Sequence, residues 1–425
     1  MHQVDPSVPV VVLGVHHGTL GIARSLGRLG IAVSCVDGDR SHPALASRYL
    51  RRVVAWDMKR APEAATVAFL EELAHRLGGR PLLIPTTDAT TLFVAQHAAP
   101  LAASFRFPRR SCELVRSFSD KGEAFRLARR LGIATPAAAF PRSSDDVREF
   151  AARATFPLML KGIDGTRLQR RMGRKMVIVR SERELAAEYT RLEEPGAHNL
   201  MLQEYIPGGD DTVWMFNGYF NTDSDCLVAF TGKKLRQHAV HVGATSLGIC
   251  LPNQAIAELT TSFMKRVGYC GILDIGYRYD ARDGVYKLLD PNPRIGCTFR
   301  LFVAQNGMDV ARCLYLDLTG QPVPAAVPRW GRKWIVEDWD VESCLDYRRE
   351  GSLTLRQWAA SLRGIEEWAW FAADDLGPFF RMAGALGWRL LRWAARRAWS
   401  RLREEVWDGP QRWWRQMVHA KSETA

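Results

Sequence analysis

Two oxygen-bearing side chains separated by one residue, Asp290 and Asn292, lie in the run LLDPNPR that ends at Arg294. On an extended segment, residues two apart leave the same face, so these side chains can converge on one ion. Asp274 lies sixteen residues before Asp290 and adds a carboxylate from a neighbouring strand. Two carboxylates and an amide oxygen suit Mg²⁺ that is also held by nucleotide phosphates. An ordinary loop is the alternative, because Asp-Pro-Asn-Pro is also a turn sequence.

Basic residues upstream could bind the phosphates of such a nucleotide. Lys161 ends an apolar, strand-like run over 156–160, and Lys121 precedes a helix that we predict over 122–131. The stretch 162–175 carries three glycines and five basic residues, Arg167, Arg170, Arg171, Arg174 and Lys175. We expect this stretch to be a hairpin loop that closes over phosphates with backbone N–H groups and cations. The alternative for either lysine is a solvated position at the end of an element.

The elements that position these residues begin with alternating strand and helix patterns. An apolar strand over 10–13 is followed by Gly14, Gly18 and Gly21, an amphipathic stretch to Gly30 and a second strand over 31–36. A helical pattern over 61–79 leads to a short buried strand over 81–85. This alternation predicts a mostly parallel sheet. The glycine spacing only approaches a dinucleotide-binding fingerprint, and a tight strand-to-helix turn explains it equally well, so neither NAD nor FAD is assigned.

Length and composition limit the class of protein. A chain of 425 residues suggests about two to three domains, and 47% apolar with 24% charged residues excludes a disordered chain. Eight cysteines show no Cys-x-x-Cys pair, which is typical of reduced thiols in a cytoplasm. The first residues lack a basic segment followed by an apolar one, and no apolar run of about 18 residues occurs. We therefore expect a cytoplasmic, multidomain enzyme or binding protein.

Five features in order carry a family resemblance. They are Lys121, Lys161, the run QEYIPG over 203–208, the run KLRQ over 234–237 and the run DPNPR over 290–294. Over roughly residues 8–320 the chain resembles the ATP-grasp superfamily, within it the carboxylate-amine ligase branch that includes D-aspartate ligase-like proteins. The resemblance implies an α/β fold (α+β in the lid) with an N-terminal Rossmann-like pre-ATP-grasp domain. Its implied divisions are 1–110 for that domain, 111–202 for the linker helix and lid, and 203–325 for the core with the Mg-ATP site.

The resemblance also implies roles for individual residues. Lysines would flank the ATP phosphates, the hinge strand would read adenine through its backbone, and two acidic residues with an asparagine would hold two Mg²⁺, or alternatively Mn²⁺. The positions are Lys121, Lys161 and Lys175 for phosphates, Gln203, Glu204, Tyr205 and Ile206 for adenine, Asp210 and Asp211 for ribose, and Asp274, Asp290 and Asn292 for metal. Two departures stand out. Asp290 occupies a position where glutamate is common, and Gly276 precedes Tyr277 where many relatives have the upstream metal ligand.

Arginines are the candidates for contact with the reacting groups. A guanidinium matches a carboxylate or a phosphate bidentately, so Arg294 and, second, Arg236 are assigned to the acyl substrate or the transferred phosphoryl group. Structural salt bridges are the alternative for both. The implied reaction activates a small-molecule carboxylate as an acyl phosphate for attack by an amine, giving an amide, ADP and phosphate. A non-catalytic ATP-binding sensor or scaffold recruited by its C-terminal tail is the competing function, and a homodimer is left open.

The last hundred residues, 326–425, lie outside the resemblance and are predicted to form a helical extension. Nine of the fourteen tryptophans lie in the last 68 residues. From 381 to 425 there are ten Lys and Arg against four acidic residues, which accounts for half of the net charge of +12. On a helix, one apolar arc gathers Leu386, Leu390, Leu391, Ala394, Ala398 and Leu402, with most arginines opposite.

Apolar and cationic faces on one helix suit an interfacial membrane helix. We therefore expect residues 380–425 to dock on an anionic membrane, at its inner face, or on a membrane protein. The alternative is a structural helix packed on the core. Nucleic acid is not expected as a partner, because the basic residues alternate with a continuous apolar face.

Overall fold

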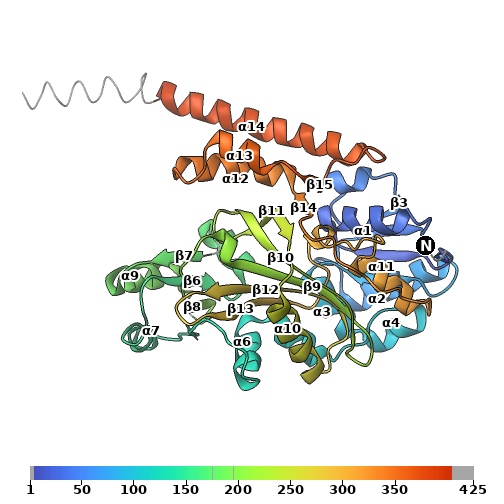
Figure 1. Cartoon of the computed structure of the whole chain (residues 1–425), viewed down its shortest axis with the longest axis horizontal. Helices are drawn as coiled ribbons and strands as arrows, with labels where there is room; N and C mark the ends of the chain where they lie inside the picture. The colour runs from blue at the N-terminus through green and yellow to red at the C-terminus, as the bar shows by residue number, and fades with distance from the viewer. Residues whose placement is uncertain (1–3, 175, 195, 404–425) are drawn as a thin grey trace, which may run out of the picture.

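A four-stranded parallel sheet forms the N-terminal part of the chain. The computed structural model describes residues 4–174, 176–194 and 196–403 (Figure 1). The strands are β1 (Val10–Leu13), β2 (Val33–Asp37), β3 (Leu50–Ala55) and β4 (Leu82–Pro85), in the order β3-β2-β1-β4. The helices are α1 (His17–Gly27), α2 (Glu63–Arg76), α3 (Asp88–Gln96) and α4 (Ala98–Ser104), with a 3₁₀ turn η1 (Pro43–Ala46). The parallel sheet expected from the alternating pattern is confirmed.

The glycines at the start of α1 have a packing role. A Cβ added at Gly21 would lie 2.8 Å from Arg300 Cγ and 2.9 Å from Phe299 Cε1. Glycine therefore lets α1 approach the segment around η3 (Phe299–Leu301) closely. This contact supports the structural explanation of the glycine spacing.

A second, antiparallel sheet forms the lid. Its order is β5-β8-β6-β7, with β6 and β7 antiparallel neighbours. The elements of this region are α5 (Cys112–Ser119), α6 (Lys121–Arg130), β5 (Ala138–Ala139), α7 (Ser144–Ala151), β6 (Leu158–Gly162), α8 (Gly165–Met172), β7 (Met176–Val179), α9 (Glu182–Leu192) and β8 (Leu200–Glu204). The expectation of a glycine loop over 162–175 was wrong, because α8 occupies most of it. Arg171 anchors this helix by donating to the carbonyls of Leu192 and Glu193.

A seven-stranded sheet forms the core, in the order β13-β12-β9-β10-β11-β14-β15. Its elements are η2 (Asp210–Thr212), β9 (Val213–Phe220), β10 (Cys226–His238), β11 (Ala244–Cys250), α10 (Gln254–Arg266), β12 (Gly271–Asp280), β13 (Val285–Asn292), α11 (Val310–Leu318), β14 (Lys333–Ile335) and β15 (Ile365–Trp368). Strand residues alternate between two faces. One face buries Phe216, Leu273 and Ile275 against α5, α6 and α10. The opposite face carries Met215 and Ile272 and turns toward α1 and α11.

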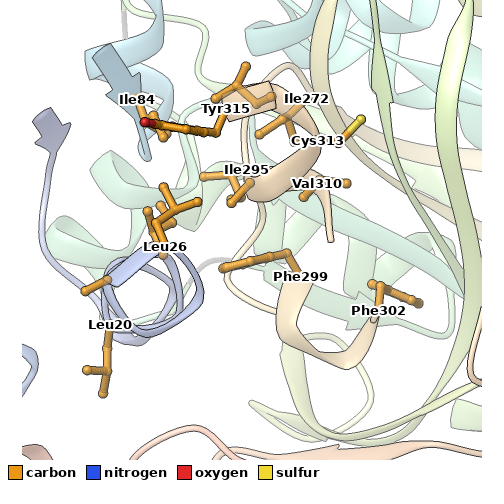
Figure 2. Packing of buried hydrophobic residues seen from close by; sticks show 14 of the residues in the cluster. Leu20, Leu26, Ile84, Ile272, Ile295, Phe299, Phe302, Val310, Cys313 and Tyr315 are labelled. Carbon is orange, nitrogen blue, oxygen red and sulfur yellow. The ribbon is translucent and has the colours of Figure 1, made fainter. Parts of the chain in front are cut away.

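The contact between this second face and the N-terminal domain is a large apolar cluster. Figure 2 shows part of it, with Leu26 of α1, Phe299 of η3 and Val310 of α11 among its labelled side chains. All three side chains are fully buried. The N-terminal domain and the core sheet therefore share one hydrophobic core, which fixes the carboxyl ends of β1 and β4 against the core sheet.

The C-terminal extension differs from the expected set of helices. Strands β14 and β15 lie between 326 and 370 and lengthen the core sheet, so the predicted boundary at 325 does not separate two folding units. Helices α12 (Glu337–Arg349), α13 (Leu355–Ser361) and α14 (Gly377–Arg403) complete the extension. In Figure 1, α14 runs along the top edge of the molecule above α12 and α13. Within the residues described, no helix is both long and apolar enough to cross a membrane.

Candidate active site

The predicted metal ligands meet on one face of the core sheet. Asp274 on β12 is directly opposite Asn292 on β13, and Gly276 is opposite Asp290. Directly opposed residues in an antiparallel pair share a face, and so do residues two apart on one strand. Asp274, Asp290 and Asn292 therefore project together, and Asp290 is exposed. The β-hairpin between β12 and β13 produces this arrangement from residues sixteen positions apart.

Gly276, which departs from the expected pattern, leaves room beside these ligands. A Cβ added at Gly276 would meet only Leu289 Cβ, at 4.0 Å. Gly296, by contrast, packs tightly on the site, because its added Cβ would lie 2.5 Å from Asp274 Oδ2. The Asp274 carboxylate is thus closely packed against Gly296, whereas there is open space at Gly276.

The donor set fits a hard divalent cation such as Mg²⁺. Two carboxylates and one amide oxygen are oxygen ligands of the kind that Mg²⁺ uses when phosphates complete its coordination. In the described part of the chain, no cluster of three or more His, Cys, Asp or Glu could hold a metal by itself. The candidate site therefore depends on Asn292 and on ligand oxygens from the nucleotide.

Two lysines interact electrostatically with the acidic pair. Burial lowers the pKa of Lys161 to about 8, with the Asp290 carboxylate acting in the opposite direction and Lys121 in the same one. Burial likewise lowers the pKa of Lys234, against the charges of Asp274 and Asp290. These opposing charges place the lysines within electrostatic reach of the carboxylates. Lys234 was missed as a site residue, although the run KLRQ was singled out.

The carboxyl group of Asp274 is strongly affected by its surroundings. Burial raises the pKa of its carboxyl group to about 6, while Arg294 and Lys234 act to lower it. A buried carboxylate gains from a cation more than an exposed one does. The electrostatics of Asp274 therefore favour a bound cation, which supports its assignment as the upstream ligand.

Lys121 connects the linker helix with the lid. It is the first residue of α6, whose N-terminus is capped by Asp120. Its Nζ donates to the carbonyl oxygens of Gly162, at 3.1 Å, and Ile163, at 2.7 Å. Lys121 therefore reaches the end of β6, the strand that carries Lys161. Lys175, the third predicted phosphate ligand, lies outside the described residues.

The predicted hinge is the end of β8. Gln203 and Ile206 are buried, and Gln203 pairs with Ala138 of β5. The Glu204 carboxylate accepts from the Ala137 N–H and from Arg282. The Tyr205 ring lies 5.3 Å from the Arg278 guanidinium carbon. Neighbouring elements contact this segment on both sides. Such contacts keep its backbone in place, which the predicted contact with adenine requires.

The two predicted ribose ligands have different surroundings. Asp210 accepts from Gln237 Nε2 at 3.0 Å and from Tyr347 of α12, and it lies 3.2 Å from His241 Nδ1. Its carboxylate is thus engaged by the C-terminal extension. Asp211 is exposed beside it. The geometry favours Asp211 over Asp210 for contact with a nucleotide.

The two predicted arginines also differ. Arg294 donates to Asp88 Oδ1 at 2.6 Å and to Asn292 Oδ1 at 3.2 Å, and its charge acts on Asp274. It therefore lies at the metal ligands and joins them to the N-terminal domain. Arg236 instead forms a buried bidentate pair with Asp340 of α12, both bonds at 2.8 Å. This favours the structural salt bridge, the alternative for Arg236.

The N-terminal domain contributes further groups at this edge. His16 Nδ1 accepts from the Gly18 N–H at 2.9 Å, so the other ring nitrogen carries the proton donated to the Thr86 carbonyl at 3.2 Å. Cys297 Sγ lies 3.4 Å from the same Nδ1. Burial lowers the pKa of His16 to about 4, so the ring is neutral at pH 7. His16 therefore caps α1 next to the segment that follows the metal strand.

Asn217 of β9 was not predicted. It is directly opposite Asp274, on the side away from Asn292, and is fully buried. Neither atom of its amide has a hydrogen-bond partner within the described residues. An unpaired buried amide lowers the stability of the fold, so we infer that Asn217 has a role beside Asp274. The available signal was an asparagine inside the otherwise apolar strand VWMFNGYF.

Comparisons with known proteins agree with this architecture. No protein-family model matches the chain. The D-aspartate ligase of Enterococcus faecium (strain Aus0004) is 25% identical over 319 residues, which cover 72% of this chain and 76% of that protein. An L-amino acid ligase from Bacillus licheniformis superposes with a TM-score of 0.56 at 14% identity, covering 74% of this chain and 75% of the other.

A further solved structure, the biotin carboxylase domain dimer of 2-oxoglutarate carboxylase from Hydrogenobacter thermophilus, contains MgADP, ADP and bicarbonate. It superposes with a TM-score of 0.57 at 15% identity, covering 76% of this chain and 72% of the other. These structural likenesses concern the fold. Together with the sequence relative, they show that the chain has the ATP-grasp fold.

Proposed function

We propose that the protein is an ATP- and Mg²⁺-dependent ligase that joins a carboxylate to an amine and releases ADP and phosphate. The observation that carries the proposal is the convergence of Asp274, Asp290 and Asn292 on one sheet face, with Lys161 and Lys234 beside them. The similarity to a D-aspartate ligase supports the amide-forming reaction. We propose a cytoplasmic location, which is consistent with eight free cysteines.

The reaction needs charge neutralisation and positioning more than a protein nucleophile. Bound ATP would supply the phosphoryl group that activates the carboxylate, and Mg²⁺ would neutralise the charge of its phosphates. A substrate carboxylate oxygen attacks the γ-phosphorus and ADP leaves; the amine nitrogen then attacks the acyl carbon and phosphate leaves. Asp274, Asp290 and Asn292 would hold the metal, and Lys121 and Lys161 would neutralise phosphate oxygens. Neither step forms a covalent bond to the chain.

Arg294 is the residue proposed to orient the carboxylate substrate. Its guanidinium lies between the metal ligand Asn292 and Asp88 at the start of α3. Part of its charge is already engaged by Asp88, which is half-exposed and can be displaced by a carboxylate ligand. Holding the substrate there would bring it to the metal ligands, which converts a bimolecular encounter into a positioned reaction.

A screen for substrate-stimulated ADP release tests the proposal. Purified protein with MgATP is given pairs of carboxylates and amines, starting with amino acids that include D-aspartate. We expect at least one pair to stimulate ADP release, and Asp290→Ala to abolish the stimulation. Asp283→Ala removes an exposed carboxylate from the same hairpin and is the matched control. ATP binding without stimulation by any pair would instead support the sensor or scaffold function.

A further inference from the structure

Among the side chains of α14 that the structure describes, one apolar group packs on the protein and another is exposed. Met382 is buried, and Phe379 and Leu386 pack partly buried against the same core cluster. Arg389 continues this inner side with an ion pair to Asp338 of α12 at 3.0 Å. The two ends of the predicted apolar arc have different surroundings, because Leu386 packs partly buried against the core whereas Leu391 is exposed. The structure does not describe the side chains of the other predicted members of the arc, which are Leu390, Ala394, Ala398 and Leu402.

The second apolar face is exposed. Phe380, Trp388 and Leu391 are 66%, 59% and 67% exposed. At about 100° per residue they fall within an arc of roughly 80° on one side of the helix. Small exposed residues, Gly384 and Ala395, lie in the same arc. Three large apolar side chains thus form a stripe without bulky polar residues between them. Helix α14 itself lies along the top edge of the molecule in Figure 1.

Cations border this stripe on one side. Arg381 and Arg392 are exposed, and the Arg392 guanidinium carbon lies 5.0 Å from the centre of the Trp388 ring. Residues 377–403 contain no aspartate or glutamate. A second copy of the helix packed on the stripe would therefore place arginines beside arginines with no acidic residue of α14 to pair with them. The charge favours an anionic surface with an apolar layer beneath it.

We propose that the Phe380, Trp388 and Leu391 face of α14 lies on an anionic lipid bilayer surface, with Arg381 and Arg392 at the headgroups. A helix with aromatic side chains between an apolar and a cationic side has the composition for the interface of a bilayer. The inner face stays attached to the core through Met382 and Leu386, so the protein docks as a folded unit. This proposal is independent of the reaction proposed for the active site.

Vesicle sedimentation of the full chain tests the proposal. Vesicles of phosphatidylcholine alone are compared with vesicles that also contain phosphatidylglycerol, at low and high salt. We expect binding to the anionic vesicles only, and less of it at high salt, because salt screens exposed charges. The triple variant Phe380→Ser, Trp388→Ser, Leu391→Ser should lose about tenfold or more in vesicle affinity. The double variant Arg381→Gln, Arg392→Gln should show a smaller loss.

Matched controls separate docking from folding. Val327→Ser with Trp330→Ser removes two exposed apolar side chains outside α14, 56% and 47% exposed, and should leave vesicle binding unchanged. The triple variant should melt close to the wild type, because its three side chains are exposed. Absence of wild-type binding, or equal binding by the triple variant, would overturn the proposal. A third outcome would also overturn it: light scattering shows that the wild type is a dimer, and the triple variant is a monomer that binds vesicles as well as the wild type does.

Discussion

Gly296→Ala tests the assignment of Asp274 as a metal ligand without removing any candidate ligand. The methyl group would lie 2.5 Å from both the Cγ and the Oδ2 of Asp274. An ordinary contact between such atoms is roughly 3.5 Å, so the carboxylate must move by about 1 Å. Asp274 lies on β12, which is paired on both sides, to β9 and β13, so its backbone is held in place. We therefore expect the carboxylate group to move.

The size of the expected effect follows from this displacement. Mg²⁺ requires near-octahedral geometry with oxygen ligands at about 2.0–2.1 Å, so a ligand displaced by about 1 Å no longer fits. Misplacement of a catalytic group by about 1 Å can cost on the order of 100-fold in rate. We expect Gly296→Ala to raise the Mg²⁺ concentration for half-maximal ADP release by about tenfold or more, and to lower the maximal rate.

The assay is steady-state ADP release at varied Mg²⁺, with calorimetric titration of Mg²⁺ and ADP as an independent measure. Gly387→Ala is the control, because no atom lies within 4 Å of its added Cβ. Thermal unfolding should show Gly296→Ala still folded. A folded Gly296→Ala protein with unchanged Mg²⁺ dependence would refute the assignment of Asp274.

Three further predictions concern single residues. Burial lowers the pKa of His16 to about 4, so protons bind the unfolded chain first as the pH falls, and stability present above pH 6.5 is lost toward pH 4. His16→Asn keeps an acceptor for the Gly18 N–H but cannot bind this proton. In urea unfolding, the free energy of unfolding should fall between about pH 7.5 and pH 5 by about 2 kcal/mol less in this variant than in the wild type. An equal fall in both proteins would contradict the assignment of this pH dependence to His16. Asn217→Leu removes an unpaired buried amide, so the free energy of unfolding should rise by about 1–3 kcal/mol while Mg²⁺-dependent ADP release falls; unchanged activity would assign Asn217 no role in the site. Asp375→Ala leaves Arg24 buried without the carboxylate that lies 2.9 Å away, so the free energy of unfolding should fall by about 3–5 kcal/mol in denaturant unfolding. Glu72→Ala breaks an exposed pair and should lower it by less than about 1 kcal/mol. Similar losses in the two variants would contradict a stabilising role for the buried pair.

Local sequence patterns predicted the elements that are determined locally. The parallel N-terminal sheet follows from strands and helices that alternate within the first 85 residues. The shared face of Asp290 and Asn292 follows from strand geometry, and the β12–β13 hairpin brings Asp274 to it. Helix α8 was missed because three glycines in a basic stretch favour a loop by propensity, while the helix is held by contacts of Arg171 with the end of α9.

Features that depend on distant pairing were not predictable from local patterns. Strands β14 and β15 are three and four residues long and exist through their pairing with β11 and with each other. Asn217 and Lys234 join the site only through the register of β9 and β10. Arg236 looked available for substrate because its partner, Asp340, lies 104 residues away. Tertiary contacts decided each of these cases.

The most direct test of the proposed reaction is trapping of the activated carboxylate. Hydroxylamine replaces the amine, in the presence of MgATP and a carboxylate that stimulates ADP release. The proposed reaction predicts a hydroxamate and ADP in equal amounts, both lost in Asp290→Ala and retained in Asp283→Ala. Formation of AMP, or ADP release without hydroxamate for every carboxylate that stimulates it, would contradict activation as an acyl phosphate.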